Sequence, residues 1–508
     1  MGRTGFQAHD RQEAISVSAH ASARTSDGVL TGTVEDGVCV FRGVPYAAPP
    51  VGALRFAPPQ APASWTGSRE ATADGPIPPQ PPSRLRAAMG DFNLRQGEDC
   101  LTLTISTPAA DRAKRPVLLW MHGGAFWTGA GSLPWYSGVP LSRHGDVVVV
   151  GVNYRLGALG FMNLPGVSPP NLGLLDQFAA LRWVSEEIAA FGGDPDNVTL
   201  VGQSAGGLSI LAMLAQPESR KRFRRAIVQS APFGRMLRPL DAAERIGQSV
   251  QRALGITEAA QWKEVSAEQI NSAQMVAARE LAGFAVTTPP FIPIADHSLL
   301  GDDLIGAALA GALERDLMIG YTRDESAAFF APDERIAQAS DQQVREVFSR
   351  FFGAAADSAI DEYRRRARTP DAFGLLTELL GDASFGAGLF DFAARMSDFG
   401  RPAHVFRFDW RAPDNRFGAC HCIELPFMFD TLPSWDAPML KGGDPADMAG
   451  LAARMRDAWI AFARTGNPEH RGLPHWPRHG HSLETMLFDS QCRVENDPAG
   501  RKRWVYWP

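Results

Sequence analysis

The chain has 508 residues, of which 45% are hydrophobic and 21% charged, and its formal net charge at pH 7 is −6. These values are ordinary for a globular protein, and the acidic balance gives no reason to expect nucleic acid or an anionic membrane as a partner. Apolar runs such as residues 146–150 are far shorter than the roughly 20 residues needed to cross a bilayer.

The first 24 residues mix charged and small residues and contain no apolar segment of the kind that a signal peptide needs. We therefore predict a poorly ordered polar extension over residues 1–24 and a single domain over residues 25–508. The five cysteines are an odd number, which argues against a disulfide framework. Without an export signal, we expect a cytoplasmic protein.

The N-terminal part begins with two predicted strands at residues 29–42, which flank the turn Glu35-Asp36-Gly37. Residues 45–82 are rich in proline and glycine, which predicts an irregular segment over the surface. From residue 115, apolar strands alternate with helices. The strands are expected at 116–120, 146–152, 197–201 and 226–228, and the helices at 174–191 and 208–214. Such strands indicate a parallel sheet covered by helices on both faces.

The second half of the chain is less regular. Residues 241–343 are more polar and contain several helix-like stretches, whereas residues 316–320 and 405–410 predict two further strands. Residues 448–463 predict an amphipathic helix that ends at Gly466. No sharp boundary divides the chain, so the sequence predicts an α/β protein with a large, mostly parallel sheet.

A candidate nucleophile lies between the strand at 197–201 and the helix that follows. The sequence there is Gly202-Gln203-Ser204-Ala205-Gly206. Small residues on both sides of a serine let the chain turn sharply, so that the hydroxyl is exposed at the end of the strand. The pattern alone also occurs in ordinary loops, but the strand–turn–helix setting favours a catalytic serine.

A serine nucleophile needs a base and an acid that orients the base, which in this arrangement follow in the order Ser, Asp or Glu, His. Asp324 and Glu325 both follow the strand at 316–320, and their spacing does not choose between them. The alternative for this acidic pair is a solvated surface turn.

Six histidines lie beyond the acidic pair, and His421 is the best candidate base because it follows the strand at 405–410 on a loop. We expect His404 to be a buried structural residue. The last four are expected to be solvated; they are His470, His475, His479 and His481. The run Cys420-His421-Cys422 lacks the second ligand pair that structural zinc needs, so we expect no metal there.

Hydrolysis through a serine also needs donors for the negative oxygen that forms on the attacked carbonyl. The amide of Ala205 supplies one. The segment from His122 to Ala125 follows the strand at 116–120 and supplies others, because glycine lets backbone N–H groups converge on one point. The alternative is a plain glycine-rich turn.

With these residues in place, the chain resembles the type-B carboxylesterases, and among them the bacterial para-nitrobenzyl esterase branch of the group that includes the cholinesterases. The resemblance runs from Thr25 to Pro508. Its motifs are residues 41–47, 98–101, 153–157, 171–177, 191–195, 320–325, 421–427 and 465–468.

The resemblance implies an α/β-hydrolase fold with an extended N-terminal region and helical insertions. It implies Ser204 as nucleophile, Glu325 rather than Asp324 as the acid, and His421 as the base. The implied supporting residues are Gly124, Ala125 and Ala205 for the oxyanion hole, Ser230 behind the triad, and Arg42, Glu98, Arg155 and Asp176 for buried salt bridges.

The chain also departs from the family pattern. Gln203 replaces the Glu that commonly precedes the serine, Ala125 replaces a third glycine of the oxyanion loop, and Ser326 replaces the Gly after the acid. Cys100 matches a half-cystine of exported relatives, but the partner position is Pro78, so that disulfide cannot form. The loop at 122–126 resembles the longer glycine-rich type found in esterases that accept esters of tertiary alcohols.

We therefore expect a serine carboxylesterase that hydrolyses small-molecule esters through an acyl-enzyme, without metal or cofactor. One alternative is a hydrolase of carbamates or amides on the same residues. Another is a non-catalytic interaction protein, which the presence of all three triad residues disfavours. The sequence leaves the physiological ester and the oligomeric state open.

Overall fold

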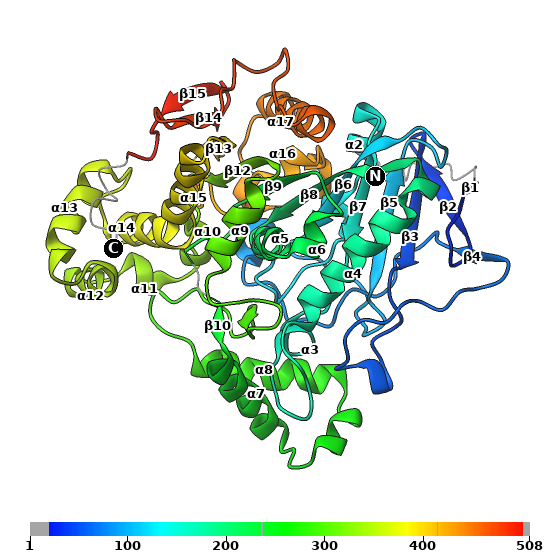
Figure 1. Cartoon of the computed structure of the whole chain (residues 1–508). Coiled ribbons are helices and arrows are strands. Elements are labelled where there is room, and N and C mark those ends of the chain that lie inside the picture. The colour runs from blue at the N-terminus through cyan, green and yellow to red at the C-terminus, as the bar shows by residue number, and fades with distance from the viewer. Residues whose placement is uncertain (1–19, 235–236, 414, 501–508) are drawn as a thin grey trace, which may run out of the picture.

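The computed structural model describes residues 20–234, 237–413 and 415–500. Its main feature is a 13-stranded sheet in which most neighbouring strands of the central part are parallel (Figure 1). The path through the sheet is β1-β2-β3-β5-β7-β6-β8-β9-β12-β13-β14-β15, and β4 pairs with β2. The α/β fold class predicted from the sequence is confirmed.

The predicted strands are all present, usually with a few more residues. The strands of the main sheet are β1 His20–Arg24, β2 Val29–Glu35, β3 Val38–Pro45, β4 Ser68–Glu70, β5 Thr102–Thr107, β6 Arg115–Met121, β7 Val148–Val152, β8 Gly193–Gln203, β9 Arg225–Gln229, β12 Asp316–Thr322, β13 His404–Phe408, β14 Glu484–Phe488 and β15 Arg493–Asn496. β10 Arg238–Pro239 and β11 Ile294–Ala295 form a separate pair. The strands that the sequence did not predict are β1, β4, β5, β10, β11, β14 and β15.

The N-terminal boundary differs from the prediction. Residues 20–24, expected to belong to a polar extension, form β1 and pair antiparallel with β2. Ala21 and Ala23 alternate with exposed residues and are buried, so this short strand has an inner face despite its polar composition. The rest of the expected extension, residues 1–19, lies outside the described residues.

Helices cover both faces of the sheet, as predicted. On one face lie α4 Leu172–Glu187, α5 Ala205–Ala215, α9 Leu304–Ala312 and α15 Ala387–Asp398, and on the other lie α2 Val139–Gly145, α16 Leu425–Met428 and α17 Pro445–Thr465. Side chains along β6 alternate between the two faces of the sheet. Val117 and Leu119 belong to the hydrophobic cluster on one face, and Leu118 and Trp120 belong to the cluster on the other. This is why the strand is apolar throughout.

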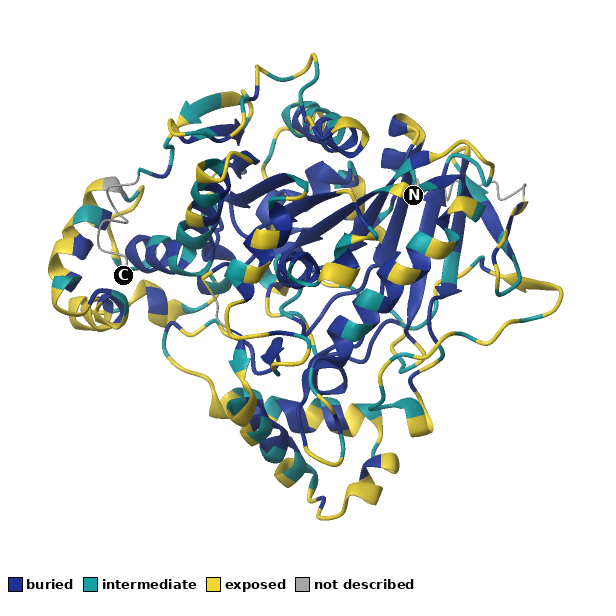
Figure 2. Cartoon of the chain, in the orientation of Figure 1, coloured by how far each residue is buried: buried dark blue, intermediate teal, exposed yellow. Residues whose placement is uncertain are grey.

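Two groups of helices lie outside this sandwich. α7 Leu240–Leu254 pairs with α8 Ala267–Glu280, and α12 Asp341–Phe352, α13 Ala356–Arg366 and α14 Ala372–Gly381 form a third hydrophobic cluster. Figure 2 shows that the central strands are buried, whereas these outer helices expose one side. No helix among the described residues is both long and apolar enough to cross a bilayer.

The expected salt bridges are only partly confirmed. Arg155 and Asp176 form a buried pair with Nη2 to Oδ1 at 2.7 Å. Arg42 pairs with Glu35, and Glu98 pairs with Arg55 at 2.6 Å. These two pairs are half-buried because their carboxylates come from β2 and from the loop before β5, near the surface.

Candidate active site

The strand β8 ends in a sharp turn at Ser204. The backbone of Ser204 has φ 56° and ψ −119°, a strained conformation for a residue with a Cβ, and α5 begins at the next residue. Its amide donates to the carbonyl of Gln229 in the neighbouring strand at 2.9 Å. A Cβ at Gly206 would lie 1.9 Å from the carbonyl oxygen of Met121, so only glycine lets α5 start this close to β6. The predicted strand–turn–helix is confirmed.

The side chains of Glu325 and His421 meet in the interior. Glu325 follows β12 and His421 follows β13, so both extend from the carboxyl ends of neighbouring parallel strands. Nδ1 of His421 forms a short hydrogen bond with Oε2 of Glu325, whose Oε1 accepts from the amide of Thr322 at 2.9 Å. Each of these two side chains is 1% exposed. The carboxylate therefore fixes the ring and leaves Nε2 facing the pocket.

Asp324 has a different neighbourhood. Its Oδ2 accepts from the amide of Ala419 at 2.8 Å, and its own amide donates to the Ala419 carbonyl at 2.9 Å. Arg368 lies 3.7 Å from the same carboxylate oxygen. Asp324 thus ties the loop that carries His421 to the end of β12, and Glu325 is the member of the acidic pair that touches the imidazole.

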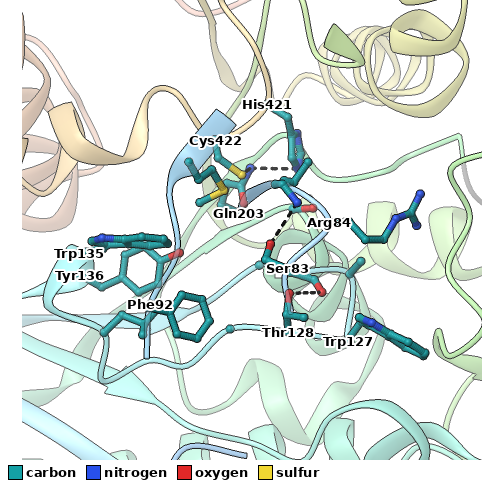
Figure 3. Close-up of a pocket in the computed structure, with 18 of the residues that line it drawn as sticks. Ser83, Arg84, Phe92, Trp127, Thr128, Trp135, Tyr136, Gln203, His421 and Cys422 are labelled. Atoms are coloured by element: carbon teal, nitrogen blue, oxygen red, sulfur yellow. Dashed lines mark hydrogen bonds between the residues drawn. The ribbon is translucent and has the colours of Figure 1, made fainter. Parts of the chain in front are cut away.

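Gln203 lies against the other nitrogen of the imidazole. Its Nε2 is 3.2 Å from Nε2 of His421 and donates to Sγ of Cys422 at 3.3 Å (Figure 3). Because Nδ1 of the ring is bonded to Glu325, Nε2 carries a lone pair that the Gln203 amide can approach as a donor. Ser204 and His421 line the same pocket, but no hydrogen bond joins their side chains among the described residues.

The loop after β6 follows the outer side of Ser204. Gly124 has φ 107°, and Ala125 and Phe126 have φ 60° and 57°. The carbonyl of Gly124 accepts from the amides of Trp127 and Thr128, each at 3.0 Å, and so points away from the pocket. A Cβ at Gly124 would meet the Thr128 carbonyl oxygen at 1.9 Å. Among the described residues the amides of Gly124, Ala125 and Ala205 have no hydrogen-bond acceptor, and they are available for an oxyanion.

Gln80 holds this loop from outside. Its Oε1 accepts from the amide of Gly129 at 2.6 Å, and its Nε2 donates to the Gly129 carbonyl at 2.9 Å. Gln80 is buried, and its own amide is anchored on the side chain of Gln96. Two hydrogen bonds to one residue fix the loop's end more firmly than one could.

Two pockets meet at Ser204, and Ala125, Ser204 and Phe329 line both. The first is aromatic; its walls include Phe92, Trp127, Trp135 and Tyr136, with Arg84 on the far side (Figure 3). The second is almost wholly apolar; its walls include Leu208, Leu237, Ile292 and Phe385. An ester bound with its carbonyl carbon at Ser204 can therefore direct its two halves to different walls.

A second carboxyl group is buried close to the site. Burial and the charge of Glu325 raise the pKa of Glu424 to about 8. Its Oε1 accepts from Nε2 of Gln229 at 3.2 Å, and its Oε2 has no partner among the described residues. A pKa of about 8 keeps most of the Glu424 carboxyl group protonated at neutral pH. Ser230 is buried at the end of β9, and its hydroxyl likewise has no partner there.

The remaining histidines are mostly placed as predicted. His404 is buried in β13, and burial lowers its pKa to about 3. His475 and His481 are exposed and His470 is half-buried, but His479 is fully buried, which corrects the expectation that it is solvated. Its Nδ1 lies 3.0 Å from the carbonyl of Glu484, because the polar stretch around it packs against the sheet edge at β14.

Sequence reasoning missed most of the pocket wall. Phe329 and Phe385 flank the imidazole with ring centroids at 5.6 and 5.0 Å from it. Phe329 comes one helical turn after Glu325, a spacing that could have revealed it. Gln80 and the segment 83–92 gave no signal, because they contribute single side chains from irregular backbone.

Comparison with known proteins agrees with this geometry. A family model described as "Carboxylesterase family" matches residues 19–502. The chain is 39% identical over 486 residues to a phenmedipham hydrolase of Pseudarthrobacter oxydans, covering 94% of this chain and 97% of that protein. It is 38% identical over 502 residues to a para-nitrobenzyl esterase of Bacillus subtilis (strain 168), covering 96% and 99%. A solved carboxylesterase of Geobacillus stearothermophilus superposes with a TM-score of 0.85 at 35% identity, covering 96% and 100%.

Proposed function

Because the chain belongs to the carboxylesterase family and is a serine carboxylesterase, we propose that Ser204 is its nucleophile, His421 its base and Glu325 the carboxylate that orients the base. The observation that carries this assignment is the buried hydrogen bond between Nδ1 of His421 and Glu325, with Nε2 directed at the pocket that Ser204 lines. It supports a neutral imidazole whose free lone pair can accept the serine proton.

The reaction proceeds in two halves. The Ser204 hydroxyl attacks the ester carbonyl carbon while Nε2 of His421 takes its proton, for which the Gln203 amide gives up its contact with that nitrogen. The amides of Gly124, Ala125 and Ala205 stabilise the oxyanion, and the alcohol leaves with the proton from His421. Water then attacks the acyl-enzyme by the same proton path, and the acid is released. Gln203 contacts the reacting nitrogen of His421 and lines the first pocket, whereas Ser230 is buried behind the triad at the end of β9.

Ser204→Ala tests the proposal. The variant should lose covalent labelling by a fluorophosphonate and lose turnover of p-nitrophenyl acetate by roughly 10⁵-fold or more, because a triad acts as a unit. Ser209→Ala is the matched control, since Ser209 is buried in α5 and its hydroxyl bonds the Ala205 carbonyl. Labelling of the Ser204 variant at the wild-type rate would assign the nucleophile elsewhere.

A second candidate function is hydrolysis of carbamates at the same site. The relative named phenmedipham hydrolase favours it, because that name fits a carbamate substrate. The two pockets at Ser204 suit either bond, since the leaving group is chosen by the walls and not by the triad. A Ser204-dependent turnover of aryl carbamates at a rate near that of aryl esters would establish it, and turnover of esters alone would reject it.

We also propose a cytoplasmic location and a single domain. All five cysteines are free in the described residues, and Cys100 is buried. Titration of the denatured, unreduced protein should find all five thiols; fewer than four would contradict a reducing compartment.

Since β1 belongs to the sheet, the proposed domain begins at His20 rather than at residue 25. Removal of residues 20–24 should therefore lower the unfolding midpoint.

A further inference from the structure

Arg84 is the one formally charged side chain among the residues that line the two pockets. It comes from the irregular segment before the short helix α1 Arg86–Met89, and it forms part of the first pocket. Its guanidinium carbon lies 5.9 Å from the centroid of Phe329, the ring that separates the two pockets and flanks His421. In Figure 3 it lies on the side of the pocket away from Trp135 and Phe92.

This guanidinium has no carboxylate partner among the described residues. Its Nη1 donates to the carbonyl of Thr287 at 3.0 Å, which fixes the group at the mouth and leaves other N–H donors free. Arg84 is exposed at the pocket, where nearby protein atoms lower the pKa of its guanidinium and no acidic neighbour offsets that effect. The side chain remains charged because guanidinium starts from a very high pKa. A guanidinium at a pocket, without a carboxylate partner, is available to an anionic part of a bound ligand.

We propose that Arg84 selects substrates whose ester carries a carboxylate some atoms away from the scissile carbonyl. The anion would accept hydrogen bonds from the free guanidinium N–H groups while the ester group lies at Ser204. The Phe329 ring and the hydrogen bond to the Thr287 carbonyl restrict where the guanidinium can lie, so its remaining donors are partly positioned before substrate binds. Gln203, which lines the same pocket, carries a neutral amide and does not compensate this positive charge.

This inference rests on the proposed function, since it places the ester at Ser204. The test uses two matched pairs of esters at constant ionic strength. Mono-4-nitrophenyl glutarate against 4-nitrophenyl pentanoate places the carboxylate in the acyl half, and 4-acetoxybenzoate against 4-methylphenyl acetate places it in the alcohol half. The measured quantity is the ratio of kcat/KM for the charged ester to that for the neutral ester.

Arg84→Gln should lower this ratio by about ten- to a hundredfold for at least one pair, mainly through KM, and Arg84→Lys should restore part of it. The wild-type ratio should fall as salt rises, and that of the Gln variant should not. The control is Arg86→Gln, since Arg86 is exposed in α1 and lines neither pocket. Thermal midpoints check that each variant is folded.

A ratio that Arg84→Gln leaves unchanged in both pairs overturns the proposal, and so does an equal change in the Arg86 variant. Ser204→Ala distinguishes failure of the anion site at Arg84 from failure of the proposed function. If Ser204→Ala abolishes turnover of the neutral esters but Arg84→Gln leaves the kcat/KM ratio unchanged, the proposed function is supported and the anion site is rejected. If neutral esters are still hydrolysed, the proposed function itself fails.

Discussion

The active site joins two regions of different construction. The elbow region, residues 193–230, consists of two parallel strands with helix α5 between them and is buried on both sides. The wall region, residues 80–92, has one helix of four residues and is held by contacts of single side chains, such as the Gln80–Gly129 pair. In the proposed function, the first region positions the reacting atoms and the second determines which substrates reach them.

This difference predicts different consequences of substitution. In the elbow region a changed side chain alters a geometry that the sheet fixes, so the loss should be the same for every ester. In the wall region it alters contacts with part of the substrate, so the loss should depend on the ester. The following experiments test whether the two regions are in fact separable, and they begin with the largest effect.

Replacement of the acid should distinguish two adjacent carboxylates. Glu325→Gln removes the charge that holds the imidazole and should lower kcat by roughly 10³- to 10⁴-fold for all esters. Asp324→Asn is the matched control and should cost less than tenfold, since Asp324 bonds the backbone of Ala419 and not the ring. Steady-state rates with p-nitrophenyl acetate measure both. A larger loss in the Asp324 variant would exchange the roles.

Asp324 and Glu325 also show which parts of the site could be predicted from the sequence and which could not. The elbow, the glycine loop and both strands that carry Glu325 and His421 were predictable, because each is an apolar strand followed by a turn with a local sequence signal. The choice of Glu325 came only from resemblance, since two adjacent side chains after a strand point in different directions that spacing does not encode. Gln80 and Arg84 could not be found, because their positions depend on packing between segments far apart in the chain.

Gln80 is the contact through which the wall region reaches the catalytic region. Gln80→Met removes both hydrogen bonds to Gly129 with little change in length. If Gln80 only shaped the pocket, the loss in kcat of this variant would differ between esters. We expect instead that kcat falls by about ten- to a hundredfold for all esters, because the oxyanion loop loses its anchor. Gln60→Met, at an exposed position of the same proline-rich segment, should leave kcat unchanged. A loss that differs between esters would mean that Gln80 only shapes the pocket and does not support the oxyanion loop.

Glu424, which accepts a hydrogen bond from Gln229 of the elbow region, tests that region through stability rather than rate. Its pKa of about 8 in the folded protein lies above the ordinary value of 4.5, so the folded state holds a proton that the unfolded state releases. The free energy of unfolding should therefore fall as pH rises from about 5 to 8, by up to about 1.4 kcal/mol per pH unit from this group.

Urea unfolding at a series of pH values should show this fall in the wild type and a flatter profile in Glu424→Gln. The control is Glu218→Gln, because Glu218 is exposed beside Lys221 and does not titrate in this range. Parallel profiles for the wild type and the Glu424 variant would mean that the carboxyl group is ionised in the folded protein at neutral pH.

The smallest expected signal concerns esters of tertiary alcohols, where the oxyanion loop meets the pocket wall. The Gly124 carbonyl is bonded to the amides of Trp127 and Thr128, so it is turned away from the side on which a third alkyl branch must fit. Ala125 lines both pockets, and we expect its methyl group to crowd the space that a third alkyl branch needs. We therefore expect slow but measurable hydrolysis of tert-butyl acetate, increased by Ala125→Gly.

The measurement is release of tert-butanol beside release of n-butanol from n-butyl acetate, with Ser204→Ala as the background. A misplaced substrate oxygen loses oxyanion donors that are each worth roughly a hundredfold to a thousandfold in turnover, so crowding by the branch would be felt strongly. The increase in Ala125→Gly should be confined to the tertiary ester, because the linear ester does not occupy that space. If the tertiary ester stays at background in both proteins, the turned carbonyl of Gly124 does not provide the room, and the limit lies in the wall.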